Sequence, residues 1–292
     1  MTRNFPPGSE WLFYKIYCGY GTADELLVEL IGKLSKYFID NGLVDSWFFI
    51  RYADPNPHIR LRYHFSDLSN IGKVMMAVTK ALQPYFETGQ VNRIMIDTYK
   101  REIERYGETT IELCEKLFRH DSEMVTDMLS TIEYLPEKET YRWLFSLKDI
   151  DTMLSDFGYS LEERHTLAKS LADGFGKEFN INESTIQQFS NIYRTSKNNI
   201  FKFMHGDDEQ SGGLYSLINQ RSEKTKDIVR QMLDMCPDRK RFENIVHSLI
   251  HMTMNRIFVA QQRKHEVVLY GFLERYYRSE VAKNKYCTNQ LT

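Results

Sequence analysis

Hydrophobic and polar positions near the N-terminus change from the period of a strand to that of a helix. Residues 11–17 are mostly aromatic or aliphatic and are followed by a glycine-rich turn, which predicts a strand. Thr22 stands three residues before Glu25, the capping-box signature of a helix N-terminus. Apolar residues then recur at helical spacing up to Phe38, and the following Asn-Gly pair predicts the end of the helix.

The pattern next predicts a second strand, a third strand, a helix and a fourth strand. The strands are predicted at 46–52, 58–65 and 91–100, with the helix at 68–86. The order β-α-β-β-α-β is that of a ferredoxin-like unit. In that layout both helices cover one face of the sheet, so we expect the other face to be free for solvent, a ligand or another domain.

From about residue 109 the pattern is helical almost throughout. The chain is therefore predicted to be α+β, with a ferredoxin-like sheet subdomain over 1–107 packed against a helical bundle over 108–292. The two subdomains are expected to form one functional unit. The predicted helices are 109–118, 121–133, 138–157, 160–175, 183–202, 213–235, 239–262 and 265–281.

Composition and charge exclude several classes of protein. The 292 residues include 13% aromatic side chains, enough for a sizeable core, and 38 basic against 40 acidic residues give a net charge of −2. Bulk charge therefore does not favour nucleic acid or anionic lipid as a partner. No stretch is apolar enough to span a membrane, no export signal begins the chain, and the four cysteines are scattered, so we expect a cytoplasmic protein.

Polar residues on the third strand form the sharpest local feature. Alternation places His58, Arg60, Arg62 and His64 on one face, and apolar residues on the other. Two guanidiniums on a rigid strand suit a carboxylate or phosphate clamp. An ordinary half-exposed strand explains the alternation equally well. The absence of acidic residues among the four positions favours the clamp.

A predicted helix carries a second polar face. His247, His251 and Asn255 recur at i, i+4 and i+8, with Arg256 beside them. A zinc site is disfavoured because the glutamate of a zinc-protease helix is replaced by Ser248 and no third ligand suggests itself. Hydrogen-bonded core histidines are the default interpretation of such a face.

The last expected strand ends in a dense run of charges. Residues 99–107 alternate basic and acidic positions before a Tyr-Gly pair, which is typical of a solvated connection. Alternatively, the turn at Tyr106-Gly107 directs Arg105 back towards the sheet. Phosphate-loop, dinucleotide and nucleophile-elbow motifs are absent from the sequence.

Three ordered motifs resemble one known family. The first motif is Trp-Phe-Phe-Ile-Arg-Tyr-Ala-Asp-Pro at 47–55 followed by His-Ile-Arg-Leu-Arg at 58–62, the second is Glu-Ile-Glu-Arg-Tyr-Gly at 102–107, and the third is His-Met-Thr-Met-Asn-Arg at 251–256. Together they are similar to the C-terminal elimination domain of class I lantibiotic dehydratases, also called the thiopeptide-type bacteriocin biosynthesis domain. The resemblance extends from Trp11 to about Tyr277. Two positions depart from the family pattern, Glu108 and Met254, and neither is a proposed catalytic side chain.

The resemblance implies a lyase that eliminates glutamate from glutamylated Ser or Thr of a ribosomal precursor peptide, leaving dehydroalanine or dehydrobutyrine. It implies no cofactor or metal, and it implies a separate enzyme that glutamylates the peptide from glutamyl-tRNA. The oligomeric state stays open, a homodimer included. By motif the catalytic residues are Arg60, Arg62, Arg105 and His251, and the substrate-binding residues are Arg51, His58, His64, Asn255 and Arg256.

Two other functions remain open. Some relatives that stand alone resemble pyridine synthases of thiopeptide pathways, which join two dehydroalanines and expel the leader peptide. The chain could instead be a non-catalytic subunit that binds the precursor by adding a strand to an exposed sheet edge.

Overall fold

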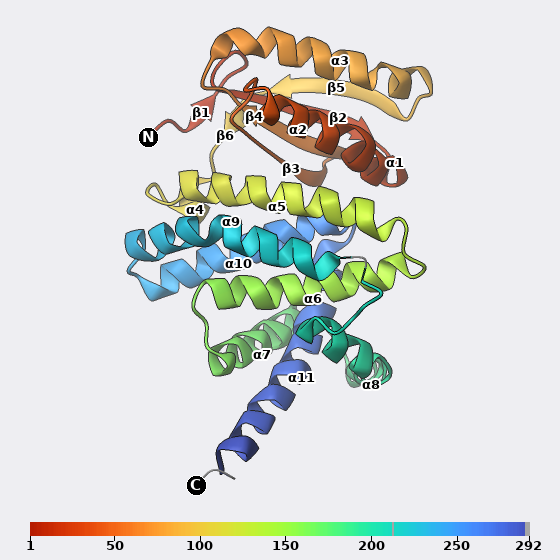
Figure 1. The fold of residues 1–292 in the computed structure, drawn as a ribbon, viewed down its shortest axis with the longest axis vertical. Helices are drawn as coiled ribbons and strands as arrows, with labels where there is room; N and C mark the ends of the chain where they lie inside the picture. Colours follow the sequence, from red (N-terminus) through yellow and green to blue (C-terminus); the bar gives the residue numbers. More distant parts are fainter. Residues whose placement is uncertain (212, 290–292) are drawn as a thin grey trace. The chain divides into compact units, whose positions relative to one another are not determined.

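The structure, a computed structural model, describes residues 1–211 and 213–289 (Figure 1). Contacts group the chain into two compact units: Met1–Ser130 with Lys224–Ala260, and Thr131–Glu223 with Gln261–Thr292. This grouping differs from a division at residue 107. Helical residues beyond position 107 belong to the first unit, and among them the ring of Phe118 packs 5.4 Å from that of Phe48 in the sheet.

Four strands form the main sheet of the first unit. They are β2 (Trp11–Cys18), β3 (Ser46–Ala53), β4 (Pro57–His64) and β5 (Val91–Asp97), in the spatial order β3-β4-β2-β5 with antiparallel neighbours. With the helices between them this is the ferredoxin-like arrangement. The predicted α+β fold is therefore confirmed.

The predicted strand over 91–100 is interrupted. β5 ends at Asp97, and β6 (Tyr99–Lys100) pairs instead with β1 (Asn4–Phe5), a strand that the sequence pattern did not predict. Two-residue strands carry too little periodicity to be recognised from sequence. Their pairing holds Tyr99 in the core, at 5% exposure.

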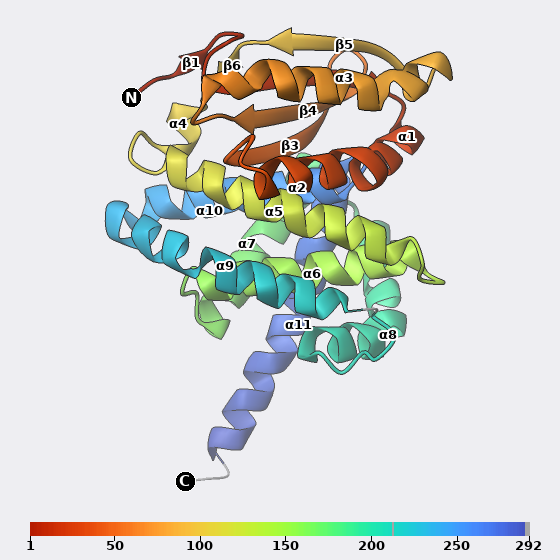
Figure 2. The same ribbon diagram turned by 45° about the horizontal axis from the view of Figure 1, so that its top comes forward.

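Helices cover one face of this sheet, as predicted (Figure 2). Tyr63 of β4 reaches into this layer and hydrogen-bonds to Ser35 at 3.0 Å. The predicted capping box does not form, because the first helix begins before Thr22 with Gly19 at its N-cap. The helical segments of this layer are α1 (Tyr20–Glu25), the π-helical η1 (Leu26–Gly32), α2 (Lys33–Asp40), the 3-10 turn η2 (Leu68–Asn70) and α3 (Ile71–Glu87).

The first unit contains further helices, two of which contact strand β3. Helix α5 contacts the sheet through Phe118, whose ring lies 5.4 Å from that of Phe48, and α10 contacts β3 and α4. Helices from beyond residue 107 therefore cover the second sheet face at this end, which is one of the occupants expected for it. These helices are α4 (Ile103–Tyr106), α5 (Ile111–Ile132), the later part of α9 (Leu214–Met235) and α10 (Arg239–Ile257).

The second unit is helical within the part that the structure describes. Helices α7 and α11 pack along each other, and Tyr277 donates a hydrogen bond to Asp151 at 3.0 Å. A capping box that the structure does contain begins α7, between Ser160 and Glu163. The helices are α6 (Lys138–Asp156), α7 (Leu161–Glu178), α8 (Glu183–His205), the first part of α9 and α11 (Gln262–Asn289).

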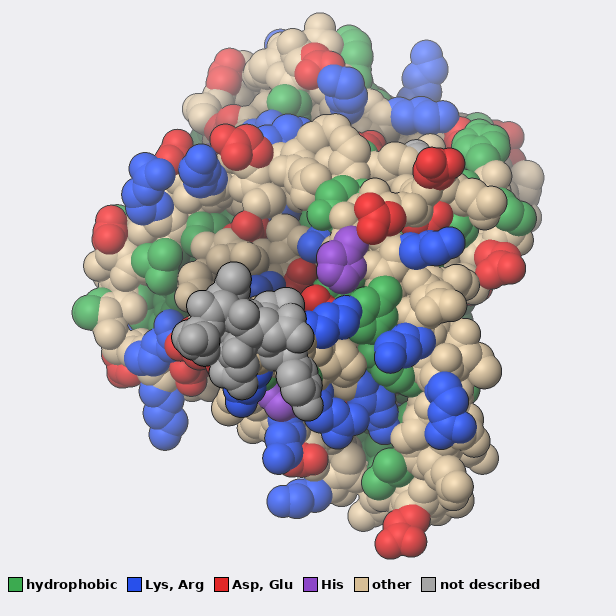
Figure 3. Space-filling model, turned by 60° about the horizontal axis from the view of Figure 1, so that its bottom comes forward, with side chains coloured by type: hydrophobic (Ala, Val, Ile, Leu, Met, Phe, Trp, Pro, Cys, Tyr) green, Lys and Arg blue, Asp and Glu red, His purple; other side chains and the backbone are tan. Residues whose placement is uncertain are grey.

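The surface mixes both signs of charge. Figure 3 shows Lys and Arg side chains interspersed with Asp and Glu, in keeping with the near-zero net charge. Among the described residues, no helix combines the length and the apolar character that crossing a membrane requires. Cys18, Cys114 and Cys236 are buried free thiols, and the side chain of Cys287 lies outside the described residues.

Candidate functional site

The basic row predicted on the third strand is present on β4. The alternate residues Ile59, Leu61 and Tyr63 are at most 1% exposed and pack towards the helical layer. The opposite face carries the four polar side chains together with the β2 residues paired to them, since partners opposite each other in antiparallel strands share a face. In register these pairs are Tyr17 with His58, Lys15 with Arg60, Phe13 with Arg62 and Trp11 with His64.

Arg62 is buried, contrary to the expectation of an uncovered basic face. Only 7% of the residue is exposed. Its guanidinium carbon lies 4.3 Å from the ring centre of Phe13, 5.0 Å from Phe48 and 4.8 Å from Tyr99. Cation–π contacts of this kind hold a guanidinium without using up its hydrogen-bond donors. Within the described residues, its Nε and Nη1 atoms have no hydrogen-bond partner.

A small cavity of about 40 Å³ adjoins Arg62. Its wall collects residues from all three motif regions, which are far apart in the sequence. Strands β3 and β4 supply one side, the segment from β6 to α5 supplies another, and α10 closes the cavity. The lining residues are Phe48, Ile50, Arg62, Tyr99, Lys100, Glu102, Tyr106, Ile111, Phe118, Met252 and Arg256.

Arg256 is the second guanidinium of this cavity, and it is fully buried. Its Nε donates to Ser122 Oγ at 3.2 Å, and its guanidinium carbon lies 5.0 Å from the ring centre of Phe118. Neither terminal nitrogen, Nη1 or Nη2, has a hydrogen-bond partner among the described residues. A buried guanidinium with unused donors is energetically costly unless it faces a ligand or water.

The cavity is a cationic and poorly solvated environment. Burial lowers the pKa of Arg62 to about 10; the nearby charges of Arg60 and Arg256 lower it further, and those of Tyr99 and Glu102 oppose the shift. Burial also lowers the pKa of Arg256, against a smaller opposing effect of Asp121. Both guanidiniums stay charged near neutral pH, so an anion placed between them would be strongly stabilised.

Arg60 is held by its neighbours on the same sheet face. Its guanidinium carbon lies 3.4 Å from the ring centre of Tyr52, and its Nε donates to His58 Nε2 at 3.2 Å. The other ring nitrogen of His58, Nδ1, lies 2.9 Å from the carbonyl oxygen of Asn56. His58 therefore accepts from Arg60 and donates to Asn56 as a neutral imidazole. Burial lowers the pKa of His58, which favours this state.

Arg105 does not turn back towards the sheet. Its side chain is 45% exposed and pairs with Glu102 at 3.3 Å, one turn earlier on α4. The residue that enters the cavity wall is Tyr106, at 3% exposure. Gly107 follows with φ +83°, where a Cβ atom would lie 2.8 Å from Thr110 Oγ1 and 2.9 Å from Arg241 Nη2, so a glycine is required.

His251 is half-buried on α10, next to the cavity-lining Met252. Helix α10 contacts both β3 and α4, so the helix that carries His251 adjoins the other two motif regions. Asn255, expected to bind substrate, bonds to the backbone of Arg51 twice: its Oδ1 accepts from the N–H and its Nδ2 donates to the carbonyl, both at 2.9 Å. These bonds cover the β3 edge.

Two predicted substrate-binding residues have structural contacts. The Arg51 side chain donates to the carbonyl oxygen of Arg256 at 2.8 Å and to Asp24 at 2.5 Å. His64 pairs with Asp45 at 2.5 Å, at the other end of β4. The sequence reasoning missed Tyr99, Glu102, Tyr106 and Met252 as wall residues, because their convergence is visible only after folding.

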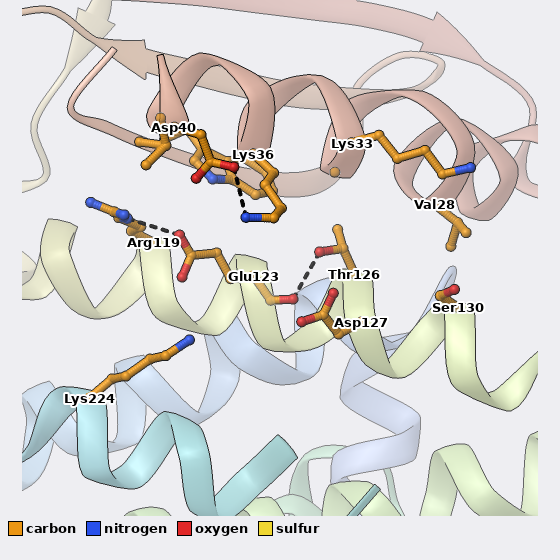
Figure 4. A pocket seen from close by; sticks show the side chains of 13 residues that line it. Val28, Lys33, Lys36, Asp40, Arg119, Glu123, Thr126, Asp127, Ser130 and Lys224 are labelled. Atoms are coloured by element: carbon orange, nitrogen blue, oxygen red, sulfur yellow. Dashed lines mark hydrogen bonds and ion pairs between the residues drawn. The ribbon is translucent and has the colours of Figure 1, made fainter. Parts of the chain in front are cut away.

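A larger cleft of about 490 Å³ lies between α2 and α5 (Figure 4). Its charged side chains largely satisfy each other: Lys36 pairs with Asp40 at 2.8 Å, and Arg119 pairs with Glu123 at 2.9 Å. Because these charges pair with each other, the cleft should bind an anion less strongly than the cavity at Arg62 does.

Comparison with known proteins agrees with the motifs. Residues 11–277 match the family model described as lantibiotic biosynthesis dehydratase C-term. Subtilin biosynthesis protein SpaB of Bacillus subtilis is 26% identical over 266 residues, which is 90% of this chain and 25% of SpaB. The chain thus spans about a quarter of the length of the curated relatives it matches.

Solved structures show the same fold. The tRNA dependent lantibiotic dehydratase MibB from Microbispora sp. 107891 superposes with a TM-score of 0.77 and 18% identity, over 95% of this chain and 29% of MibB. The pyridine synthase TbtD from thiomuracin biosynthesis superposes with a TM-score of 0.67 and 11% identity, over 94% of this chain and 99% of TbtD. With the family match over most of its length, the chain belongs to the lantibiotic biosynthesis dehydratase C-terminal family.

Proposed function

We propose that the protein is a carbon–oxygen lyase that eliminates glutamate from glutamylated Ser or Thr residues of a ribosomal precursor peptide. The observation that carries this proposal is the convergence of all three motif regions on one buried, cationic cavity. A site that releases a carboxylate needs fixed positive charge in a dry environment, since preorganised donors stabilise negative charge as it develops.

The reaction assigns a task to each motif residue. His251 takes the Cα proton of the modified residue, and the electrons of the Cα–H bond delocalise into the neighbouring carbonyl group as an enolate. These electrons form the Cα–Cβ double bond as the Cβ–O ester bond breaks, and glutamate leaves with the electron pair of that bond as a carboxylate. Arg60 and Arg62 hold the carboxylates of the glutamyl group, and Arg105, whose side chain pairs with the cavity-lining Glu102, stabilises the developing oxyanion. An imidazole is suited to the proton transfer because its pKa lies near neutrality.

The proposed partners follow from the chemistry. The substrate must already carry a glutamyl ester, so a separate enzyme that glutamylates the precursor is required. Neither a cofactor nor direct contact with nucleic acid enters the elimination itself.

Mass spectrometry of a synthetic glutamylated peptide tests the proposal. Incubation with the protein should convert the glutamyl ester to dehydroalanine with release of free glutamate. An unchanged peptide, under conditions in which the protein is folded and binds it, would contradict the lyase assignment.

A pyridine synthase is the second candidate, and the shared fold, over 94% of this chain and 99% of TbtD, is the observation that favours it. A peptide carrying two dehydroalanines distinguishes the candidates: ring formation with loss of the leader would support the cyclase. The third candidate, a non-catalytic peptide-binding subunit, is supported by β5, which pairs only with β2 among the described strands of its sheet. Binding without any mass change would favour it.

A further inference from the structure

We propose that Arg62 and Arg256 form a buried subsite for the side-chain carboxylate of the glutamyl group. This inference rests on the proposed function and names which part of the substrate the cavity accepts. It also gives Arg256 a direct role in substrate recognition.

The first step is electrostatic. Two guanidiniums line the same small cavity, and they carry four nitrogen atoms without a partner among the described residues: Nε and Nη1 of Arg62, and Nη1 and Nη2 of Arg256. Like charges brought together away from water repel each other. An anion between them would remove this repulsion and satisfy the unused donors.

The acidic residues near the cavity do not supply an anion to the two guanidiniums. Glu102 lines the cavity, but its side chain is 60% exposed and pairs with Arg105. Asp121 lies near Arg256, and its Oδ2 accepts a hydrogen bond from Thr253 at 3.0 Å. The four guanidinium nitrogens therefore have no hydrogen-bond partner among the described residues, the acidic side chains included.

The volume and the lining of the cavity suit the side-chain carboxylate of a glutamyl group. A volume of about 40 Å³ suits a small head group, and the remaining wall is largely apolar, from Phe48, Ile50, Ile111, Phe118 and Met252. Such a wall accommodates the two methylenes of a glutamyl side chain.

The chemistry of the ester then identifies the group. An amino acid transferred from tRNA is linked through its α-carboxyl, so the side-chain carboxylate is the one anionic group of the glutamyl residue before the Cβ–O bond breaks. Binding of this group contributes equally to the ground state and the transition state. Its loss should therefore appear mainly in KM, whereas loss of a group that acts on the leaving carboxylate should appear in kcat.

Arg256→Met is the decisive substitution. Methionine fills most of the arginine volume without a charge, and replacing a buried, incompletely paired charge by an apolar side chain is usually neutral or stabilising. The variant should therefore fold with a melting temperature equal to or above that of the wild type. Arg93→Met, at an exposed arginine of β5 that does not line the cavity, is the matched control.

Two measurements on the full chain test the subsite. Calorimetric titration with glutarate, a free dicarboxylate, should detect binding to the wild type and to Arg93→Met. Arg256→Met should bind glutarate roughly 10- to 100-fold more weakly, the range expected when a hydrogen bond to a charged group is lost. Elimination assays with glutamyl-ester and glutaminyl-ester peptides should show that the wild type prefers the glutamyl ester through a lower KM, and that Arg256→Met loses this preference.

The outcomes separate the two proposals. Elimination of both esters with equal KM, or glutarate binding unchanged in a folded Arg256→Met variant, would overturn the subsite while leaving the lyase assignment intact. Glutarate binding that depends on Arg256, without elimination of any ester, would support the subsite as an anion site and overturn the lyase.

Discussion

Aromatic rings determine how the site holds its cations. Arg62 lies among three rings, and Arg60 lies over one, so packing positions both. Two donor nitrogens of Arg62 have no partner among the described residues, whereas Arg60 donates through its Nε to His58. A carboxylate partner on the protein would position a guanidinium equally well but would neutralise it. Positioning by rings therefore preserves the positive charge that a leaving carboxylate needs.

His58 makes the stability of the first unit depend on pH. Burial lowers its pKa, so the unfolded chain binds a proton more readily than the folded protein. The stabilisation by neutral His58 is complete above its ordinary pKa of about 6.5 and is lost as the pH falls towards the lowered folded value. Lys15 and Arg60 oppose protonation, and Asp54 favours it.

Urea unfolding at about pH 7.5 and about pH 5 measures this effect. The wild type should lose stability at the lower pH, and His58→Gln should lose less. Part of the pH dependence will remain in His58→Gln, because burial also lowers the pKa values of His247 and His265. His205→Gln, exposed on α8, should behave as the wild type. An unaltered pH dependence in His58→Gln would show that His58 is not held neutral.

His251 is the proposed base, and its replacement tests the proton transfer. His251→Ala should lower kcat for glutamate release by about 100-fold or more, the usual contribution of a general base, with little change in melting temperature. His247→Ala removes an imidazole one turn earlier on the same helix and should retain activity. Full activity of His251→Ala would assign the proton transfer to another group.

The single-residue predictions from sequence succeeded where alternation alone was sufficient. The faces of β4 were predicted because strand side chains alternate strictly, and the structure confirms the burial of Ile59, Leu61 and Tyr63. The environment of Arg62 could not be predicted, because it depends on Phe118 and Arg256, which arrive from helices distant in the sequence.

At the scale of elements, α10 is attached to β3 through the Asn255 amide and through the Arg51 side chain, which donates to the carbonyl oxygen of Arg256. Asn255 bonds to both backbone groups of Arg51 and so replaces a neighbouring strand at the β3 edge. This arrangement brings Met252 and Arg256, one turn apart, to the cavity wall.

Removing this amide should destabilise the first unit. Asn255→Ala leaves the N–H and carbonyl of Arg51 buried without partners, so the free energy of unfolding should fall by about 2 kcal/mol or more in a urea titration. Asn244→Ala, at an exposed position of the same helix, should change it by less than about 0.5 kcal/mol. Equal effects of the two substitutions would mean that the bonds to Arg51 contribute little.

Periodicity predicted the existence of most elements but not all their ends. The β-α-β-β-α-β order was recognised because each element is long enough to repeat its pattern. The expected break between 109–118 and 121–133 does not occur: α5 continues through Arg119 and His120, where packing keeps the helix intact. The capping box at Thr22 failed because the preceding Gly19 already ends the strand and lets the helix begin earlier.

At the scale of the whole molecule, the chain corresponds to about a quarter of its curated relatives. Family motifs indicated the candidate residues from sequence, Arg256 among them, whereas the burial of Arg256 and the exposure of Arg105 could be seen only in the folded structure.

The most direct test of the account is the rate of glutamate release by Arg62→Met. Methionine retains contact with the surrounding rings and removes the charge at the centre of the cavity, so the variant should stay folded by thermal unfolding. The account predicts a loss of about 100-fold or more in kcat/KM on a glutamylated peptide, the range found when one preorganised donor is removed. Release at the wild-type rate by folded Arg62→Met would contradict it.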